Sequence, residues 1–201
     1  MADESLPAHS LAEAHLYLLA RPCGSCGQGP VRGERTVSKK QDTTCGGSTV
    51  EIHGFCATCG TEIVVCFRLS EEMTKSVDTQ PAVVNPTVEQ SRILDLADWL
   101  TLFRMITEAA SRETNRIQAR QLGIEAALCL EEGLKFFEDE DNDLPSAKAF
   151  FSESSLHRFR QNPEQFSKQR LLELRSKLPT MAAMRSALER PERRSWWRRS
   201  R

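Results

Sequence analysis

Several features that would place the chain in a specialised class are missing from its sequence. No stretch approaches the roughly 18 consecutive apolar residues that a membrane-spanning helix needs. The first ten residues are acidic and lack a basic region followed by an apolar one, so we expect no secretory signal. The net charge is only -1 over 201 residues, which argues against a surface built throughout for nucleic acid. We therefore expect a globular protein of the cytoplasm.

Motifs of the common catalytic centres are missing as well. The chain has no H-E-x-x-H motif, no G-x-S-x-G turn and no phosphate-binding glycine loop. The acidic run 138–143 resembles a calcium loop only in its first positions. Leu144 stands where that loop needs glycine, and Phe150 stands where it needs a bidentate acid. An enzyme is accordingly the least favoured class of function, because no acid–base pair or nucleophile can be named.

Cysteine is concentrated in one half of the chain and nearly missing from the other. Six of the seven cysteines and eight of the ten glycines precede residue 70. An odd number of cysteines without a secretory signal argues against a disulfide framework and for a reducing compartment. Composition divides the chain into an N-terminal helix plus a ribbon-like module (1–70), a polar linker (71–91), a helical domain (92–180) and a basic tail (181–201).

The strongest motif is a pair of C-x-x-C-G sequences, at 23–27 and 56–60. Two intervening residues let the chain turn so that both sulfurs face one ion, and the final glycine can take the positive φ that such a turn often needs. Four thiolates at tetrahedral positions are the preferred environment of structural zinc. The paired motifs therefore predict a metal site. We expect zinc, although a rubredoxin-like iron site uses very similar knuckles.

The residues around the second motif predict a β-hairpin. Val50 and Ile52 alternate with polar residues before it, and the alternation resumes from Ile63 to Leu69 after it. The segment from about residue 15 to residue 69 resembles a zinc ribbon, in which two knuckles on adjacent hairpins hold one zinc. By position, this resemblance implies a structural Zn²⁺ with the ligands Cys23, Cys26, Cys56 and Cys59.

The resemblance covers about a third of the chain, and the sequence departs from the ribbon pattern before the first knuckle. There, Ser10 to Glu13 form a capping-box pattern that predicts a helix where a ribbon has a strand. Cys66, in an apolar strand, and Cys129, in an apolar helix face, are interpreted as small core residues. Cys45 lies in a predicted loop and has no cysteine partner two residues away, so we expect that it is not a ligand. The alternative is that Cys45 replaces one of the four ligand cysteines. His53 is interpreted as a residue of the strand surface.

From residue 98 onward the hydrophobic spacing changes to the period of a helix. One apolar stripe runs from Trp99 to Ala110 and another, in a different register, runs from Ala119 to Phe137. These stripes predict two antiparallel helices with a bend near 111–115. Pro145 and the pair at 162–163 predict the starts of two more helices. Six phenylalanines are expected to pack these later helices on the end of the second: Phe136, Phe137, Phe150, Phe151, Phe159 and Phe166.

The expected fold class is therefore α+β, with a small ribbon-like β module followed by an all-α bundle of about four helices. The helical half is loosely similar to helical-repeat adaptors and to uncharacterised bacterial proteins that join a ribbon to helices. Neither resemblance identifies an activity.

Positive charge is concentrated at the end of the chain. Residues 185–201 carry a net charge of +5, which leaves -6 for the rest. Two adjacent tryptophans between arginine pairs define a candidate binding tail of Arg193, Arg194, Trp196, Trp197, Arg198 and Arg199. Such a segment can bind phosphates, stack on unpaired bases, lie at a membrane interface or dock in an acidic groove. It can equally be a frayed terminus without a function.

Three classes of function remain. The favoured one is a non-catalytic zinc-binding adaptor, whose zinc module and helices bind another protein. The second is a nucleic-acid-associated ribbon protein, which uses the tail and the basic residues near the knuckles, Arg32, Arg35, Lys39 and Lys40. The third is an enzyme.

Overall fold

The chain folds into a sheet followed by helices, which confirms the α+β class. The computed structural model describes residues 5–42, 47–70, 84–85, 87–137 and 142–179, with backbone only at 34–42, 47–48 and 70. Cys45, most of the predicted linker and the whole candidate tail, from Arg193 to Arg199, lie outside the described residues. No helix in the described ranges is long and apolar enough to cross a membrane.

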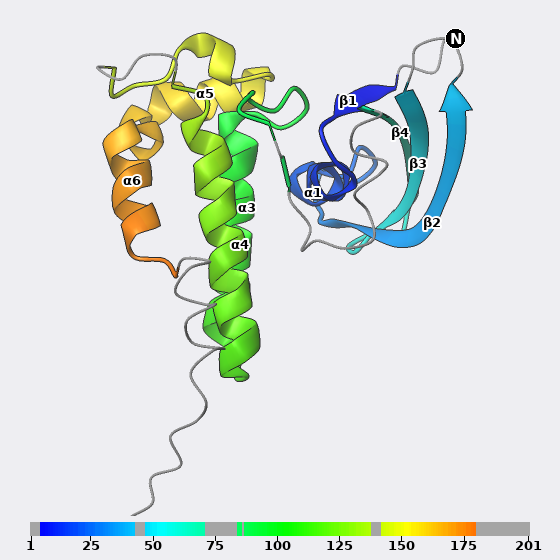
Figure 1. Ribbon diagram of the computed structural model, residues 1–201, viewed down its shortest axis with the longest axis horizontal. Coiled ribbons are helices and arrows are strands. Elements are labelled where there is room, and N and C mark those ends of the chain that lie inside the picture. The colour runs from blue at the N-terminus through cyan, green and yellow to red at the C-terminus, as the bar shows by residue number, and fades with distance from the viewer. Residues whose placement is uncertain (1–4, 43–46, 71–83, 86, 138–141, 180–201) are drawn as a thin grey trace, which may run out of the picture.

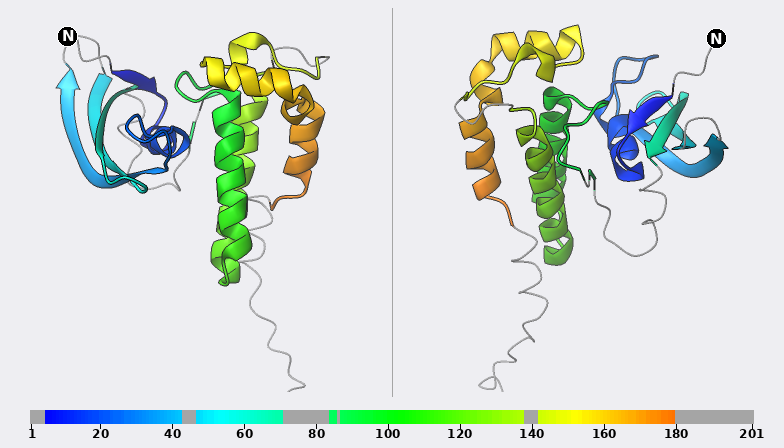
Figure 2. Two further views of the ribbon diagram at one scale, coloured as in Figure 1. Left: turned by 180° about the vertical axis from the view of Figure 1, so that it is seen from behind. Right: turned by 45° about the horizontal axis from the view of Figure 1, so that its top comes forward.

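The sheet curves around one helix, as Figures 1 and 2 show. Its strands are β1 (Leu6–Ala8), β2 (Val31–Asp42), β3 (Gly47–Cys56) and β4 (Glu62–Ser70), in the order β1-β4-β3-β2. Strands β2, β3 and β4 are antiparallel, whereas β1 pairs in parallel with β4. Helix α1 (Leu11–Ala20) lies on the concave face, where Tyr17 meets the ring of Phe67 edge to face.

Helix α1 begins where the sequence predicts it, because Ser10 caps its first turn. The Ser10 hydroxyl accepts the backbone N–H of Glu13 at 3.0 Å and donates to the backbone oxygen of Val84. The Glu13 carboxylate accepts the backbone N–H of His9. The segment before the first knuckle is thus a helix, as its capping residues predict, where a zinc ribbon would have a strand.

The helical half is built on two long helices that pack side by side (Figure 1). Helix α3 (Leu96–Arg112) begins at a capping box in which Asp95 and Asp98 exchange hydrogen bonds, and helix α4 (Arg116–Leu134) begins at Asn115. The predicted bend near 111–115 is confirmed. Helix α5 (Glu153–Gln161) lies across the end of this pair, and α6 (Lys168–Ser176) runs beside α4.

The two later α-helices begin after the predicted starts, although Asn162 and Pro163 do begin a short 3₁₀ turn as cap and first residue. Residues Ala147–Ala149 and Pro163–Phe166 form short 3₁₀ turns, and the α-helices begin after Ser152 and Ser167. Each of these serines accepts a backbone N–H from the residue three positions later, at 3.1 and 3.2 Å. Side-chain capping therefore fixes both starts in place of the prolines.

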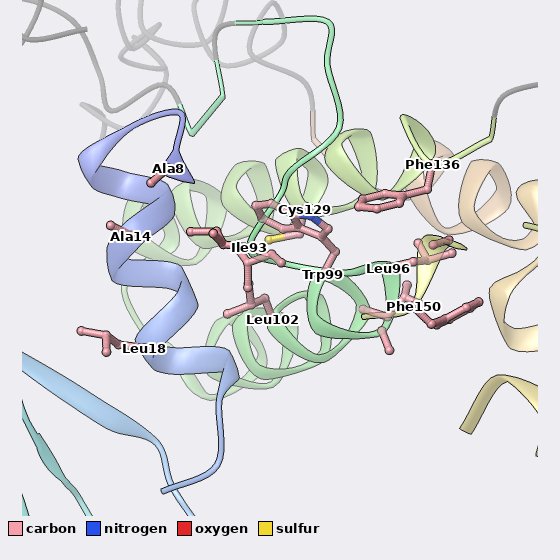
Figure 3. Close-up of a cluster of buried hydrophobic side chains, with 14 of the residues drawn as sticks. Ala8, Ala14, Leu18, Ile93, Leu96, Trp99, Leu102, Cys129, Phe136 and Phe150 are labelled. Atoms are coloured by element: carbon pink, nitrogen blue, oxygen red, sulfur yellow. The ribbon is translucent and has the colours of Figure 1, made fainter. Parts of the chain in front are cut away.

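The predicted packing of the phenylalanines is confirmed. Phe150, Phe159 and Phe166 form one group with ring centroids 4.7–5.9 Å apart, and Phe151 contacts Phe136 at the end of α4. Cys129 is buried in α4, as predicted. Figure 3 shows this core continuing from α3 and α4 past Ile93 to α1. The buried side chains of the sheet module and of the helices thus belong to one cluster, while the division of the chain into domains stays a proposal.

A buried carboxylate links stability to pH through His9. Glu13 is fully buried, and the Nδ1 atom of His9 lies 3.3 Å from its Oε2. The hydrogen bond with Glu13 raises the pKa of His9 above its ordinary value of 6.5, against the effect of burial. The charges of Glu13 and Glu89 raise this pKa further, and that of Arg92 opposes them.

We expect this stabilisation to be complete below pH 6.5 and to be lost as the pH rises through the raised pKa of His9, because the folded state holds the proton more tightly. The Tm of thermal unfolding should therefore fall more steeply between about pH 6.5 and about pH 8.5 for the wild type than for His9→Gln. Asp98, whose pKa is raised to about 6 mainly by burial, is present in both proteins, so its titration does not separate the two curves. Parallel curves for the two proteins would contradict the role of His9.

Candidate metal centre

The two C-x-x-C-G motifs lie at neighbouring turns of the sheet module. The first connects α1 to β2, and the second connects β3 to β4 at the tip of the predicted hairpin. Each turn is closed in the same way, because Gly27 donates its N–H to the oxygen of Cys23 at 2.8 Å and Gly60 donates to that of Cys56 at 2.9 Å. The two knuckles are therefore local copies of one conformation.

The glycine that ends each knuckle has the predicted positive φ, 68° at Gly27 and 72° at Gly60. Nothing lies within 4 Å of a Cβ atom added at either position, so a side chain would meet conformational strain and no steric clash. Gly24, in the same first knuckle, is equally open but has no positive φ. Substitutions at Gly24 and Gly27 thus separate the effect of a positive φ from the effect of steric crowding on the knuckle.

We expect Gly27→Ala to weaken metal affinity by roughly 5- to 30-fold, since a left-handed conformation costs an L-residue about 1–2 kcal/mol. Gly24→Ala should leave the affinity nearly unchanged. Competition with a chromophoric chelator measures both. Equal losses from the two substitutions would show that φ is not what the turn requires.

The four sulfur atoms form a compact cluster. All of the Sγ atoms of Cys23, Cys26, Cys56 and Cys59 lie within 4.8 Å of one another. Two pairs across the knuckles, Cys23–Cys59 and Cys26–Cys56, are 3.7 Å apart. A disulfide needs about 2.05 Å, so these sulfurs are unbonded. A tetrahedron with Zn–S bonds of about 2.3 Å has sulfur–sulfur edges of about 3.8 Å, so the cluster could hold a metal ion of this size.

Two hydrogen bonds join the second knuckle to the residues just after the first, independently of the sulfurs. Ala57 donates its N–H to the oxygen of Pro30 at 2.9 Å, and the hydroxyl of Thr58 donates to the oxygen of Gly29 at 3.1 Å. Cys23 and Cys56 are buried, with exposed fractions of 1% and 2%, whereas Cys26 and Cys59 are exposed. The chain thus fixes the positions of the four sulfur atoms, and one side of the cluster faces solvent.

The thiols of the cluster differ in acidity. The hydroxyl and the backbone of Thr61 lower the pKa of Cys59 to about 6. Backbone hydrogen bonds within the first knuckle, from Cys26 foremost, lower the pKa of Cys23. At Cys26 the backbone of Gln28 acts in the same direction, but desolvation and hydrogen bonds shared with the other thiols outweigh it and raise the pKa to about 12. Without a cation, ionisation of one thiol thus disfavours ionisation of its neighbours. A divalent cation would remove this conflict, because it stabilises all four thiolates at once.

The other residues considered as ligands lie apart from the cluster or outside the described residues. His53 pairs with Glu62 at 3.3 Å on the strand surface, as predicted. The interpretation of Cys66 as a core residue is wrong, since it is half-buried and alternates with the buried Phe67 and Leu69 in β4. Cys45 falls outside the described part, so the prediction that it is no ligand stands untested.

The basic residues near the knuckles are described only in part. Arg32 is exposed and pairs in register with Phe55, whereas the side chains of Arg35, Lys39 and Lys40 lie outside the described part. Thr58 and Thr61, which the sequence motifs did not single out, contact the sulfur atoms of Cys56 and Cys59. Their place directly before and two residues after Cys59 was the available signal.

No protein-family model, curated protein or solved structure matches this chain. Its function is therefore argued from the site itself.

Proposed function

We propose that Cys23, Cys26, Cys56 and Cys59 are the ligands of one structural Zn²⁺. The observation that supports this assignment is the closed group of four sulfurs, with 3.7 Å edges between the knuckles. The ion would hold the tip of the β3–β4 hairpin against the turn between α1 and β2. The two knuckles gain from such a crosslink, because within residues 22–28 and 56–60 only Cys23 and Cys56 are buried.

The same donor set supports a non-catalytic role. Four thiolates occupy every position of a tetrahedral ion, so none is left for a water molecule or a substrate. The metal then shapes a surface. Phe55 and Val64, which are 39% and 49% exposed, lie diagonally on neighbouring strands beside the second knuckle, on the face of the sheet opposite α1. Exposed apolar side chains on a rigid sheet suit a protein contact, so the chain acts as an adaptor that binds another protein.

The adaptor role is tested by comparing what binds to matched variants. A tagged chain should retain one protein in stoichiometric amount, and Phe55→Ser combined with Val64→Ser should lose it. Val88→Ser is the control, because Val88 is 94% exposed but lies in the loop before α3. The zinc content of the wild type, the double variant and the control must be equal. Loss of the bound protein can then be assigned to the changed side chains and not to loss of the ion. Retention of the same protein by the double variant would contradict this docking face.

A further inference from the structure

A row of arginines lies outside the metal centre, where α1, α3 and α5 meet. Asp98, Thr101 and Arg104 are three residues apart on α3 and therefore share one face of that helix. Arg21, just after α1, reaches Asp98 with its Nη2 atom 3.2 Å from Oδ2. Arg158 of α5 donates to the Thr101 hydroxyl at 3.2 Å. We call Arg21, Arg158 and Arg104 the arginine row.

The row is extended. Its contacts follow α3, where six residues separate Asp98 from Arg104 and place their backbones about 9 Å apart along the axis. Arg104 lies at the far end, where its Nη2 atom donates to the side-chain oxygen of Gln165 at 2.8 Å. Solvent reaches the row, since Arg104 is exposed, Arg158 is half-buried and the Arg21 side chain is 29% exposed.

Positive charge exceeds negative charge along this face. Arg104 and Arg158 donate to neutral oxygen atoms, and Asp98 is the carboxylate that pairs with Arg21. Burial and the neighbouring Asp95 raise the pKa of Asp98 to about 6 in spite of the arginines. Glu108, one turn beyond Arg104, is bound to Arg112.

We propose that the arginine row binds the phosphodiester backbone of a single nucleic acid strand. The planar fork of each guanidinium matches the oxygens of a phosphate group. Three such groups, held at successive positions along α3, exceed what one phosphate can occupy, and they suit a short run of phosphates on one strand. The contacts hold phosphates and read no bases, so binding is independent of sequence. This inference goes beyond the adaptor role and does not depend on the metal.

The test is the salt dependence of binding to a labelled single-stranded RNA of mixed sequence, followed by fluorescence anisotropy. Each phosphate contact to a single strand contributes about 0.7 to the slope of log K against log salt concentration. Arg104→Gln should therefore lower that slope by about 0.7, and Arg104→Gln with Arg158→Gln should lower it by about 1.4. Every variant keeps the full chain, so any contribution of the terminal arginines is common to all.

Arg112→Gln is the matched control, because Arg112 is an exposed arginine of the same helix that is paired with Glu108. Its slope should equal that of the wild type. Thermal unfolding checks the fold of each variant. If Arg158→Gln destabilises α5, the single variant Arg104→Gln still tests the proposal. Equal slopes for Arg104→Gln and Arg112→Gln would overturn the proposal. So would displacement of the RNA by poly-glutamate as effectively as by unlabelled RNA, since the row would then be a general anion surface.

Discussion

Substitution of a single knuckle cysteine is expected to empty the metal centre. For the wild type we expect about one zinc per chain, bound by four thiolates. Cys59→Ser should reduce this to almost none, because a neutral hydroxyl replaces a thiolate whose charge Thr61 favours. Cys59 is exposed, so the substitution removes little buried surface and isolates the effect of coordination. Elemental analysis of freshly purified, reduced protein gives the zinc content directly.

The loss of zinc should unfold residues 15–69, the second half of α1 included, and leave α3 and α4 in place. Binding of structural zinc contributes about 10–16 kcal/mol in small zinc-dependent peptides, which is most of their folding free energy. Amide spectra should therefore lose the signals of β3 and β4 and retain those of α3 and α4. A wild-type protein without metal, or a Cys59→Ser variant that keeps it, would refute the ligand set.

Two other cysteines serve as controls for this experiment. Cys66→Ser should keep its zinc, because Cys66 lies within β4 and is not one of the four cysteines of the sulfur cluster. Cys45→Ser should also keep it, since a loop thiol without a paired cysteine is a weak ligand. Stoichiometric loss of zinc from Cys45→Ser would show that Cys45 replaces one of the four.

The sequence predicted best those features that depend on neighbours along the chain. The C-x-x-C-G spacing brought four sulfurs into one cluster, and alternation predicted the β3–β4 hairpin. Ser10 predicted the start of α1 because a cap acts within one turn. The face of Cys66 could also have been inferred, since it lies in the alternation that contains Arg68, and an arginine rarely faces the core.

Features that depend on tertiary contacts were missed. Strand β1 has three residues, too few for a period, and it forms only because it reaches the edge of β4 in parallel. The contacts of Thr58 and of Ala57 with the first knuckle join residues about 30 positions apart. At α5 and α6 two local signals competed. The prolines indicated earlier starts, and the serine caps determined the actual ones.

Trp99 gives the second prediction with a large expected effect. Its side chain is fully buried in the layer between α3 and α4, within the cluster that also reaches α1 (Figure 3). Trp99→Ala should lower the free energy of unfolding by about 3–5 kcal/mol, because it removes apolar contacts and leaves a cavity. Chemical denaturation followed by circular dichroism at the helix band measures this loss.

The indole nitrogen of Trp99 allows a second comparison, between the stabilities of Trp99→Phe and Trp99→Ala. This Nε1 atom is buried and has no hydrogen-bond partner among the described residues. Burial of an unsatisfied donor costs about 1–3 kcal/mol, so Trp99→Phe loses part of the ring but also removes that penalty. We therefore expect Trp99→Phe to retain most of the stability that Trp99→Ala loses. If the two variants were equally unstable, the nitrogen would have to contribute a favourable interaction, and the cavity would not be the main cause of the loss.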